Sequence, residues 1–67
     1  MKEKVIETLR NSVNGLRLRE LASEMRINRL SLIPVLYEME SAGIVATRAN
    51  TDHANGEYYN IWYLVGA

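Results

Sequence analysis

The stretch LRLRELASEMRINRLSLIPVLYEMESAGIV, residues 16–45, decides the fold of this chain. Its apolar residues recur at helical spacing on both sides of a short break at residues 26–28. We therefore expect one helix over residues 19–25, a tight turn, and a second helix over residues 29–42. The buried face of the first of these helices is expected to carry Leu18, Leu21, Ala22 and Met25.

The ends of the second helix are marked, and its middle is interrupted. Asn28 is a good N-cap residue, and Gly43 can adopt the left-handed conformation that ends a helix. Pro34 removes one backbone hydrogen bond and clashes with the carbonyl of Leu30, at a cost of about 3 kcal/mol in a helix interior. We therefore expect a kink at Pro34, or a helix that effectively begins near residues 31–32.

The residues before this stretch predict one more helix and a short strand. Val5, Ile6 and Leu9 share one face of a helix over residues 2–12, with Val13 just beyond it. Asn14-Gly15 then breaks the helix, since both residues tolerate a positive φ. The apolar-charged-apolar alternation of residues 16–18 indicates a very short strand.

The residues after it predict a β-hairpin. We expect a strand over residues 44–48, a polar loop rich in turn formers over 49–56, and a second strand over 57–65. Alternation in the second strand divides its residues between two largely apolar faces, so that strand is covered on both sides or leaves one side for a partner. The two faces are Tyr59, Ile61, Tyr63 and Val65, and Tyr58, Asn60, Trp62 and Leu64.

Composition restricts how this chain is stabilised. Its 67 residues allow a single domain, 1–67, and a chain this short buries only about 60% of its unfolded surface. It has no Cys and one His, His53, so we expect no disulfide, no metal site and no cofactor. Association with a second chain is the remaining means by which small domains gain stability.

Hydropathy and charge indicate where the chain is located and how it can contact nucleic acid. No apolar run approaches the roughly 20 residues of a membrane span, and the charged start MKEKVIETLR does not resemble a signal peptide. We therefore expect a cytoplasmic protein that does not enter a membrane. Eight basic and eight acidic residues cancel, but residues 1–29 carry seven basic and four acidic side chains, whereas residues 30–67 carry one and four. Any contact with nucleic acid must therefore use a local basic patch.

In this order, the segments LRELASEM, INRLSLIPVLYEMESAGIV and YYNIWYLV resemble the supporting helix, recognition helix and closing strand of a winged-helix domain. The resemblance implies an α+β fold, a winged helix-turn-helix of three helices with a two- to three-stranded antiparallel β wing. The helix-turn-helix would span about 18–43 and the wing about 44–65. The chain is also similar to small regulators of fimbrial operons, and LYEMESAGIV to PadR-type regulators, whose extra dimerisation helix this sequence does not include.

The resemblance implies that the helix over residues 29–42 inserts into the major groove of duplex DNA, as in a small transcriptional regulator. Arg29, Ser31 and Tyr37 are the base-side candidates on its outer face. Glu38 on the same face would repel phosphate unless it reads the amino group of a cytosine. The full set of candidate DNA-binding residues is Arg17, Arg19, Arg26, Asn28, Arg29, Ser31, Tyr37, Arg48 and Asn50.

Two alternatives stay open for these side chains. The arginines hold phosphates, or they form a solvated surface paired with Glu20 and Glu24. The loop that begins at Arg48 is a wing tip that enters the minor groove, or a loop without function.

The outer face of the same helix also suits a protein partner, because it is unusually apolar. Under this hypothesis the domain is a protein-interaction module that docks through this face or through the aromatic strand. A homodimer is a further expected partner, since one small domain makes few contacts with DNA. The candidate interface residues are Leu30, Ile33, Pro34, Tyr37 and Trp62.

The sequence does not predict an enzyme or a small-molecule ligand. It has no Gly-rich phosphate loop, and no set of residues assembles a nucleophile, a base and an oxyanion site. The aromatic residues of the last strand can stack nucleobases, but the domain has no Phe, so we expect them to supply its aromatic core.

Overall fold

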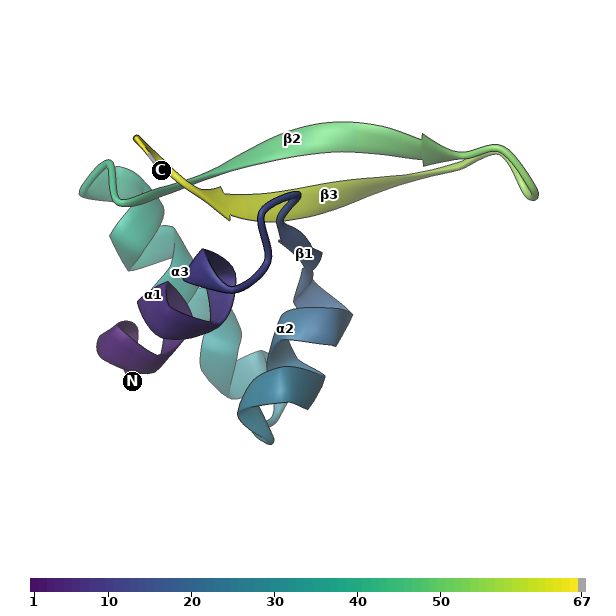
Figure 1. Ribbon diagram of the computed structural model, residues 1–67. Coiled ribbons are helices and arrows are strands. Elements are labelled where there is room, and N and C mark those ends of the chain that lie inside the picture. Colours follow the sequence, from purple (N-terminus) through teal and green to yellow (C-terminus); the bar gives the residue numbers. More distant parts are fainter. Residues whose placement is uncertain (67) are drawn as a thin grey trace.

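The computed structural model describes residues 1–66 and shows three helices beside a three-stranded antiparallel sheet (Figure 1). This α+β arrangement is consistent with a winged helix, as the sequence predicts. The elements, in chain order, are α1 (Lys2–Arg10), β1 (Leu16–Arg17), α2 (Leu18–Met25), α3 (Arg29–Ser41), β2 (Val45–Asp52) and β3 (Glu57–Leu64).

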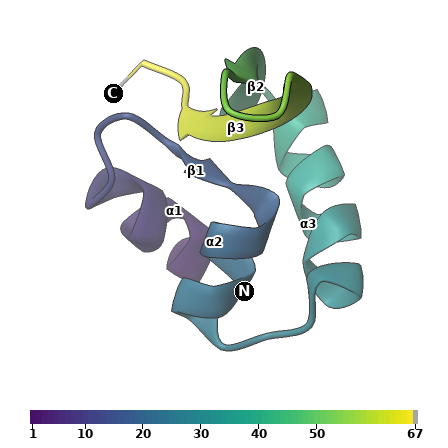
Figure 2. The same ribbon diagram turned by 90° about the vertical axis from the view of Figure 1, so that its right-hand side faces the viewer.

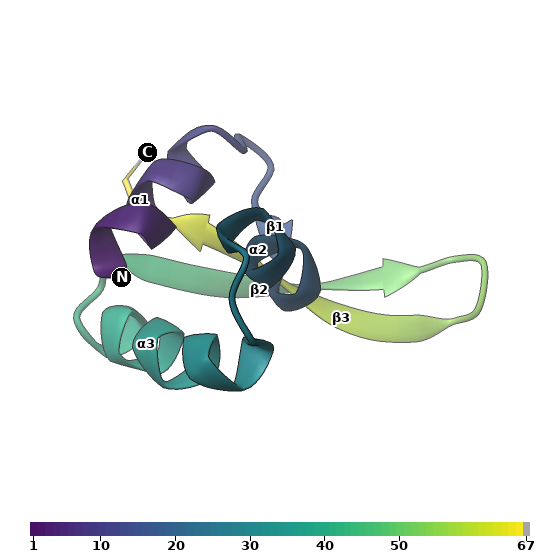
Figure 3. The ribbon, with the colours of Figure 1, turned by 90° about the horizontal axis from the view of Figure 1, so that it is seen from below.

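The sheet has the strand order β1-β3-β2, so the last strand lies in the middle. β1 pairs only two residues with β3, Leu16 with Trp62 and Arg17 with Ile61. β2 pairs with β3 along its whole length, from Val45 opposite Leu64 to Asp52 opposite Glu57. The distal part of this hairpin therefore has no third strand, and it projects well beyond the helices (Figures 1 and 3).

The core fills the space between the three helices and one face of the sheet. Leu21, Leu32, Leu36 and Met39 are fully buried, which confirms the helical spacing read from the sequence. The remaining buried residues are Val5, Leu9, Ala22, Met25, Val45 and Trp62. The expectation that Val13 follows the buried face of α1 is wrong, because α1 ends at Arg10 and the side chain of Val13 is 93% exposed.

The turn between α2 and α3 is held by hydrogen bonds at both helix ends. The Asn28 side chain accepts a hydrogen bond from the Leu30 backbone N–H at 2.8 Å, which confirms it as the N-cap of α3. Arg26 ends α2 in the left-handed conformation (φ 57°), with the Ile27 N–H donating to the Ala22 carbonyl. This is a Schellman ending in which Arg occupies the place that glycine favours.

α3 ends in the same way at Gly43. The Gly43 N–H donates to the Glu40 carbonyl and the Ile44 N–H to the Met39 carbonyl, at 3.0 and 2.9 Å. Ile44 therefore belongs to the helix ending, and β2 begins one residue later than predicted.

Pro34 does not delay the start of α3. The helix runs without interruption from Arg29, so the predicted start near residues 31–32 is wrong. The cap provided by Asn28 and the burial of Leu32 and Leu36 hold the first turns in place despite the proline.

The hairpin is longer than the sequence predicts. Residues 49–52 were expected in a loop, but they form the end of β2, where Asn50 and Thr51 pair with Tyr59 and Tyr58. Asn50, a residue of low strand propensity, is held here by cross-strand pairing with Tyr59. Only residues 53–56 connect the strands, and the Asp52 carbonyl accepts the Gly56 N–H at 2.7 Å.

Gly15 allows the chain to enter β1 tightly against β3. Its φ is +79°, and a Cβ atom there would lie 2.5 Å from the Ile61 Cγ2 and 2.6 Å from the Trp62 carbonyl oxygen. A side chain at this position would therefore separate β1 from the sheet, and with it the start of α2.

Candidate nucleic-acid interface

A hollow of about 350 Å³ opens between α3, the start of α2 and the central strand β3. We call it the arginine groove, because three guanidinium groups line it. Figure 2 looks toward this side of the molecule, with the hairpin projecting toward the viewer. The lining residues are Arg17, Leu18, Arg19, Arg29, Ile33, Tyr37, Tyr59, Asn60 and Trp62.

Arg17 is held in place by both its backbone and its side chain. It lies where β1 gives way to α2, and its backbone N–H donates to the Glu20 Oε1 at 2.9 Å. Its guanidinium carbon lies 3.5 Å from the centre of the Tyr59 ring, a cation–π contact that stacks the charge on β3. The cation is thus oriented while its N–H groups have no carboxylate partner.

None of the arginines in residues 1–66 has a carboxylate within 4.0 Å. The two ion pairs of this part of the chain join the amino terminus to Glu3 and Lys2 to Glu38. The predicted ion pairs of the arginines with Glu20 and Glu24 are therefore not formed, and Glu20 accepts the Arg17 backbone N–H instead. Whether the arginines hold phosphates or only form a solvated surface stays a prediction. The arginine groove is lined by three cationic side chains and no anionic one.

The negative charge of Glu38 on α3 is offset locally. The Lys2 Nζ lies 2.6 Å from the Glu38 Oε1 and links the first turn of α1 to α3. Both side chains are exposed, so the pair contributes little stability. It does reduce the repulsion that Glu38 would exert on a phosphate near α3.

The exposed face of α3 is both apolar and polar, as the sequence predicts. Leu30 is 77% exposed and Tyr37 58% exposed, while Arg29, Ser31 and Pro34 are also on the surface. Ile33 is only half-buried and lies along the groove.

Trp62 is buried, which contradicts the prediction that it forms part of a docking surface and confirms the expectation that it belongs to the aromatic core. It is 7% exposed, because its strand places it on the face of the sheet that covers the core. Its ring meets that of Tyr37 edge to face, with centroids 6.0 Å apart. Trp62 thus packs against Tyr37 and positions the Tyr37 ring beside the groove.

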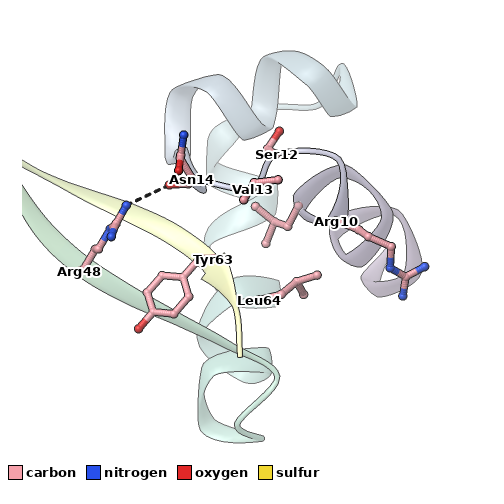
Figure 4. Close-up of a pocket in the computed structure, with 8 residues that line it drawn as sticks. Arg10, Ser12, Val13, Asn14, Arg48, Tyr63 and Leu64 are labelled. Atoms are coloured by element: carbon pink, nitrogen blue, oxygen red, sulfur yellow. Dashed lines mark hydrogen bonds between the residues drawn. The ribbon is translucent and has the colours of Figure 1, made fainter. Parts of the chain in front are cut away.

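Arg48 is remote from the wing tip at which the sequence placed it. It lies in the middle of β2 opposite Ile61, and its guanidinium donates to the Asn14 carbonyl at 3.3 Å (Figure 4). There it lines a second hollow of about 490 Å³, formed with the loop between α1 and β1. None of the residues of this second hollow lines the arginine groove.

The other predicted DNA-binding residues are exposed but outside the groove. Asn50 lies on the projecting part of β2, and its side chain accepts the N–H of Thr51. Arg26 lies in the turn before α3, and the side-chain oxygen of Asn28 is occupied by the cap. The structure therefore brings Arg17, Arg19, Arg29 and Tyr37 together, and it leaves Arg26, Asn28, Ser31, Arg48 and Asn50 outside the groove.

Three groove residues are absent from the predicted binding sets: Leu18, Tyr59 and Asn60. The signal for Asn60 was in the alternation of the last strand, which placed it on the same face as Trp62. Leu18 was assigned only to the core, but it lies at the first turn of α2, where the groove begins.

Residues 1–66 form neither a metal-ligand cluster nor a membrane-spanning helix. No group of three or more His, Cys, Asp or Glu side chains in this range can hold a metal ion. No helix in this range combines the length and apolar character needed to cross a membrane. The sequence matches no protein-family model, and a search of curated proteins finds no relative.

Proposed function

We propose that this chain is a small transcriptional regulator of the winged-helix type that binds duplex DNA without catalysing a reaction. The observation that carries the proposal is the arginine groove, in which Arg17, Arg19 and Arg29 meet without any carboxylate partner. Unpaired guanidinium groups that converge on one surface are the usual means of holding a phosphate backbone. The zero net charge of the chain is no obstacle, because the positive charge is concentrated where contact would occur.

We further propose that the side chains in and beside the groove have different roles. Arg17 and Arg19, at the start of α2, hold phosphates and position the domain. Arg29, Ser31 and Tyr37, on the exposed face of α3, face base edges in the major groove. The projecting hairpin carries Asn50 and contacts the backbone beyond them.

Amide chemical shifts during titration with a random-sequence duplex at low salt test this proposal. We expect the changes to concentrate at residues 17–19, 29–37 and 50–60, and to fade as salt is added, since phosphate contacts release counterions. Changes confined to other parts of the chain, or none at about millimolar DNA, a concentration above ordinary non-specific dissociation constants, would show that the groove does not bind DNA.

A second function is favoured by the exposure of Leu30 and Tyr37 on the same face of α3. We propose, as the alternative, that Leu30, Ile33, Pro34 and Tyr37 form a docking site for a protein partner. Affinity for DNA distinguishes the two functions. If α3 reads DNA, Leu30→Ser and Tyr37→Glu weaken DNA binding, because they remove an apolar contact and add a charge beside phosphate. If α3 docks a protein, both variants keep the DNA affinity of the unmodified chain.

A further inference from the structure

The end of the molecule away from the hairpin tip carries a second apolar surface. α1 and the end of β3 lie together there in two perpendicular views (Figures 1 and 3). Val13 is 93% exposed, Val65 51% and Ile44 37%. We call this surface the α1 face and define it by Ile6, Glu7, Arg10, Val13, Ile44 and Val65.

The residues of the α1 face are contiguous. Arg10 lines three adjoining hollows, one toward Val13, one toward Glu7, and one toward Ile44 and Val65. Ile6 lines two of the three. The face therefore has apolar side chains with charged groups of both signs among them.

The two charges nearest the middle of this face are unpaired. Within residues 1–66, neither Arg10 nor Glu7 has an oppositely charged partner within 4.0 Å, although they lie three residues apart on α1. Glu3 is already engaged, 3.7 Å from the amino terminus. A backbone hydrogen bond and then that ammonium group lower the pKa of Glu3, so it stays ionised beside its own partner.

We propose that the α1 face binds a second copy of this chain in a two-fold symmetric dimer. In such an interface each contact occurs twice, so Arg10 of one copy meets Glu7 of the other, and the reverse. A surface with both signs of charge around apolar residues is complementary to itself, which favours an identical chain over a membrane or a nucleic acid. Val13, Ile44 and Val65 become buried, and the ion pairs fix the register.

The size of the chain is compatible with this arrangement. A stable interface buries about 800 Å² per partner, which is about a sixth of the 4778 Å² of accessible surface on this chain. None of the residues that define the α1 face lines the arginine groove, so both copies keep their grooves open. The dimer is thus independent of DNA binding, and either proposal can fail alone.

Sedimentation of the full chain without DNA tests the dimer by charge exchange. We expect Arg10→Glu and Glu7→Arg each to weaken dimerisation at least about tenfold, because each places like charges together twice in one interface. An equimolar mixture of the two variants restores opposite charges at both positions and should recover the dimer. Lys4→Ala, on the same helix but outside the α1 face, serves as the control and should not change the dissociation constant.

Val13→Asp is a second variant that cannot disturb the core, because Val13 is 93% exposed. It should give a folded monomer, with the helical circular dichroism of the unmodified chain. An unmodified chain that stays monomeric at about 1 mM, a limit typical of very weak association, overturns the proposal. A dimer that persists in both charge variants and in Val13→Asp also overturns it.

Discussion

Replacing Pro34 with alanine should stabilise this domain, because the proline lies inside α3 with its ring on the surface. The Leu30 carbonyl has no N–H partner at position 34, and an interior proline costs about 3 kcal/mol relative to alanine. Alanine also gives the unfolded chain more freedom, which offsets roughly 0.4–1 kcal/mol of that gain. Pro34 is exposed, so little packing is lost. We therefore expect a net gain of about 2 kcal/mol.

Thermal and urea denaturation measure this gain. For a domain of this size, about 2 kcal/mol corresponds to a rise in Tm of roughly 8–16 °C. Glu40→Ala, at an exposed position near the end of the same helix, is the matched control and should change the free energy of unfolding by no more than about 0.5 kcal/mol. A Tm for Pro34→Ala that is equal to or below that of the unmodified chain would refute the reasoning, since the ring would then contribute to packing.

Three other substitutions test the local geometry. Gly15→Ala should cost at least about 2 kcal/mol of folding free energy, because a Cβ there overlaps the backbone of β3. Gly56→Ala, also at positive φ but in open space, should cost only about 1 kcal/mol. Equal losses of folding free energy for the two variants in urea denaturation would contradict the contact assigned to Gly15. Arg26→Gly should raise the free energy of unfolding by about 0.5–1 kcal/mol at high salt, since it removes left-handed strain; a decrease would show that the arginine side chain stabilises the turn. Asn28→Ala should lower the Tm by roughly 4–8 °C, through the loss of about 1 kcal/mol of capping to Leu30, and an unchanged Tm would argue against that cap.

Much of the fold could be predicted from the sequence, because its signals are local. The helical spacing of Leu21, Leu32 and Leu36, the cap at Asn28 and the ending at Gly43 each depend on residues close together in the chain. The start of α3 was harder to predict, since the cost of Pro34 is local whereas the burial that offsets it is tertiary. The length of the hairpin was missed for the same reason, because polar residues became strand only through their partners on β3.

The candidate site was predicted in part. Arg17, Arg19 and Arg29 were chosen from their position around a helical turn, and the structure brings these three to one groove. The sequence predicts Arg48 at the start of the wing tip, but pairing extends β2 to Asp52, so Arg48 lies in mid-strand opposite Ile61 and contacts the Asn14 carbonyl. The sequence predicts both a core role and an alternative interface role for Trp62, because strand alternation alone does not tell which face of the sheet the helices cover.

The salt dependence of binding to duplex DNA tests the arginine groove most directly. Fluorescence anisotropy across a range of salt concentrations should give a logarithm of the binding constant that falls linearly with the logarithm of salt, with a slope of about −0.9 for each phosphate neutralised. Combined replacement of Arg17, Arg19 and Arg29 by alanine should make that slope shallower by about 2.7, whereas Lys4→Ala should leave it unchanged. The same slope in the triple variant and the unmodified chain, or no binding at low salt, would contradict the proposal that the groove holds the DNA backbone.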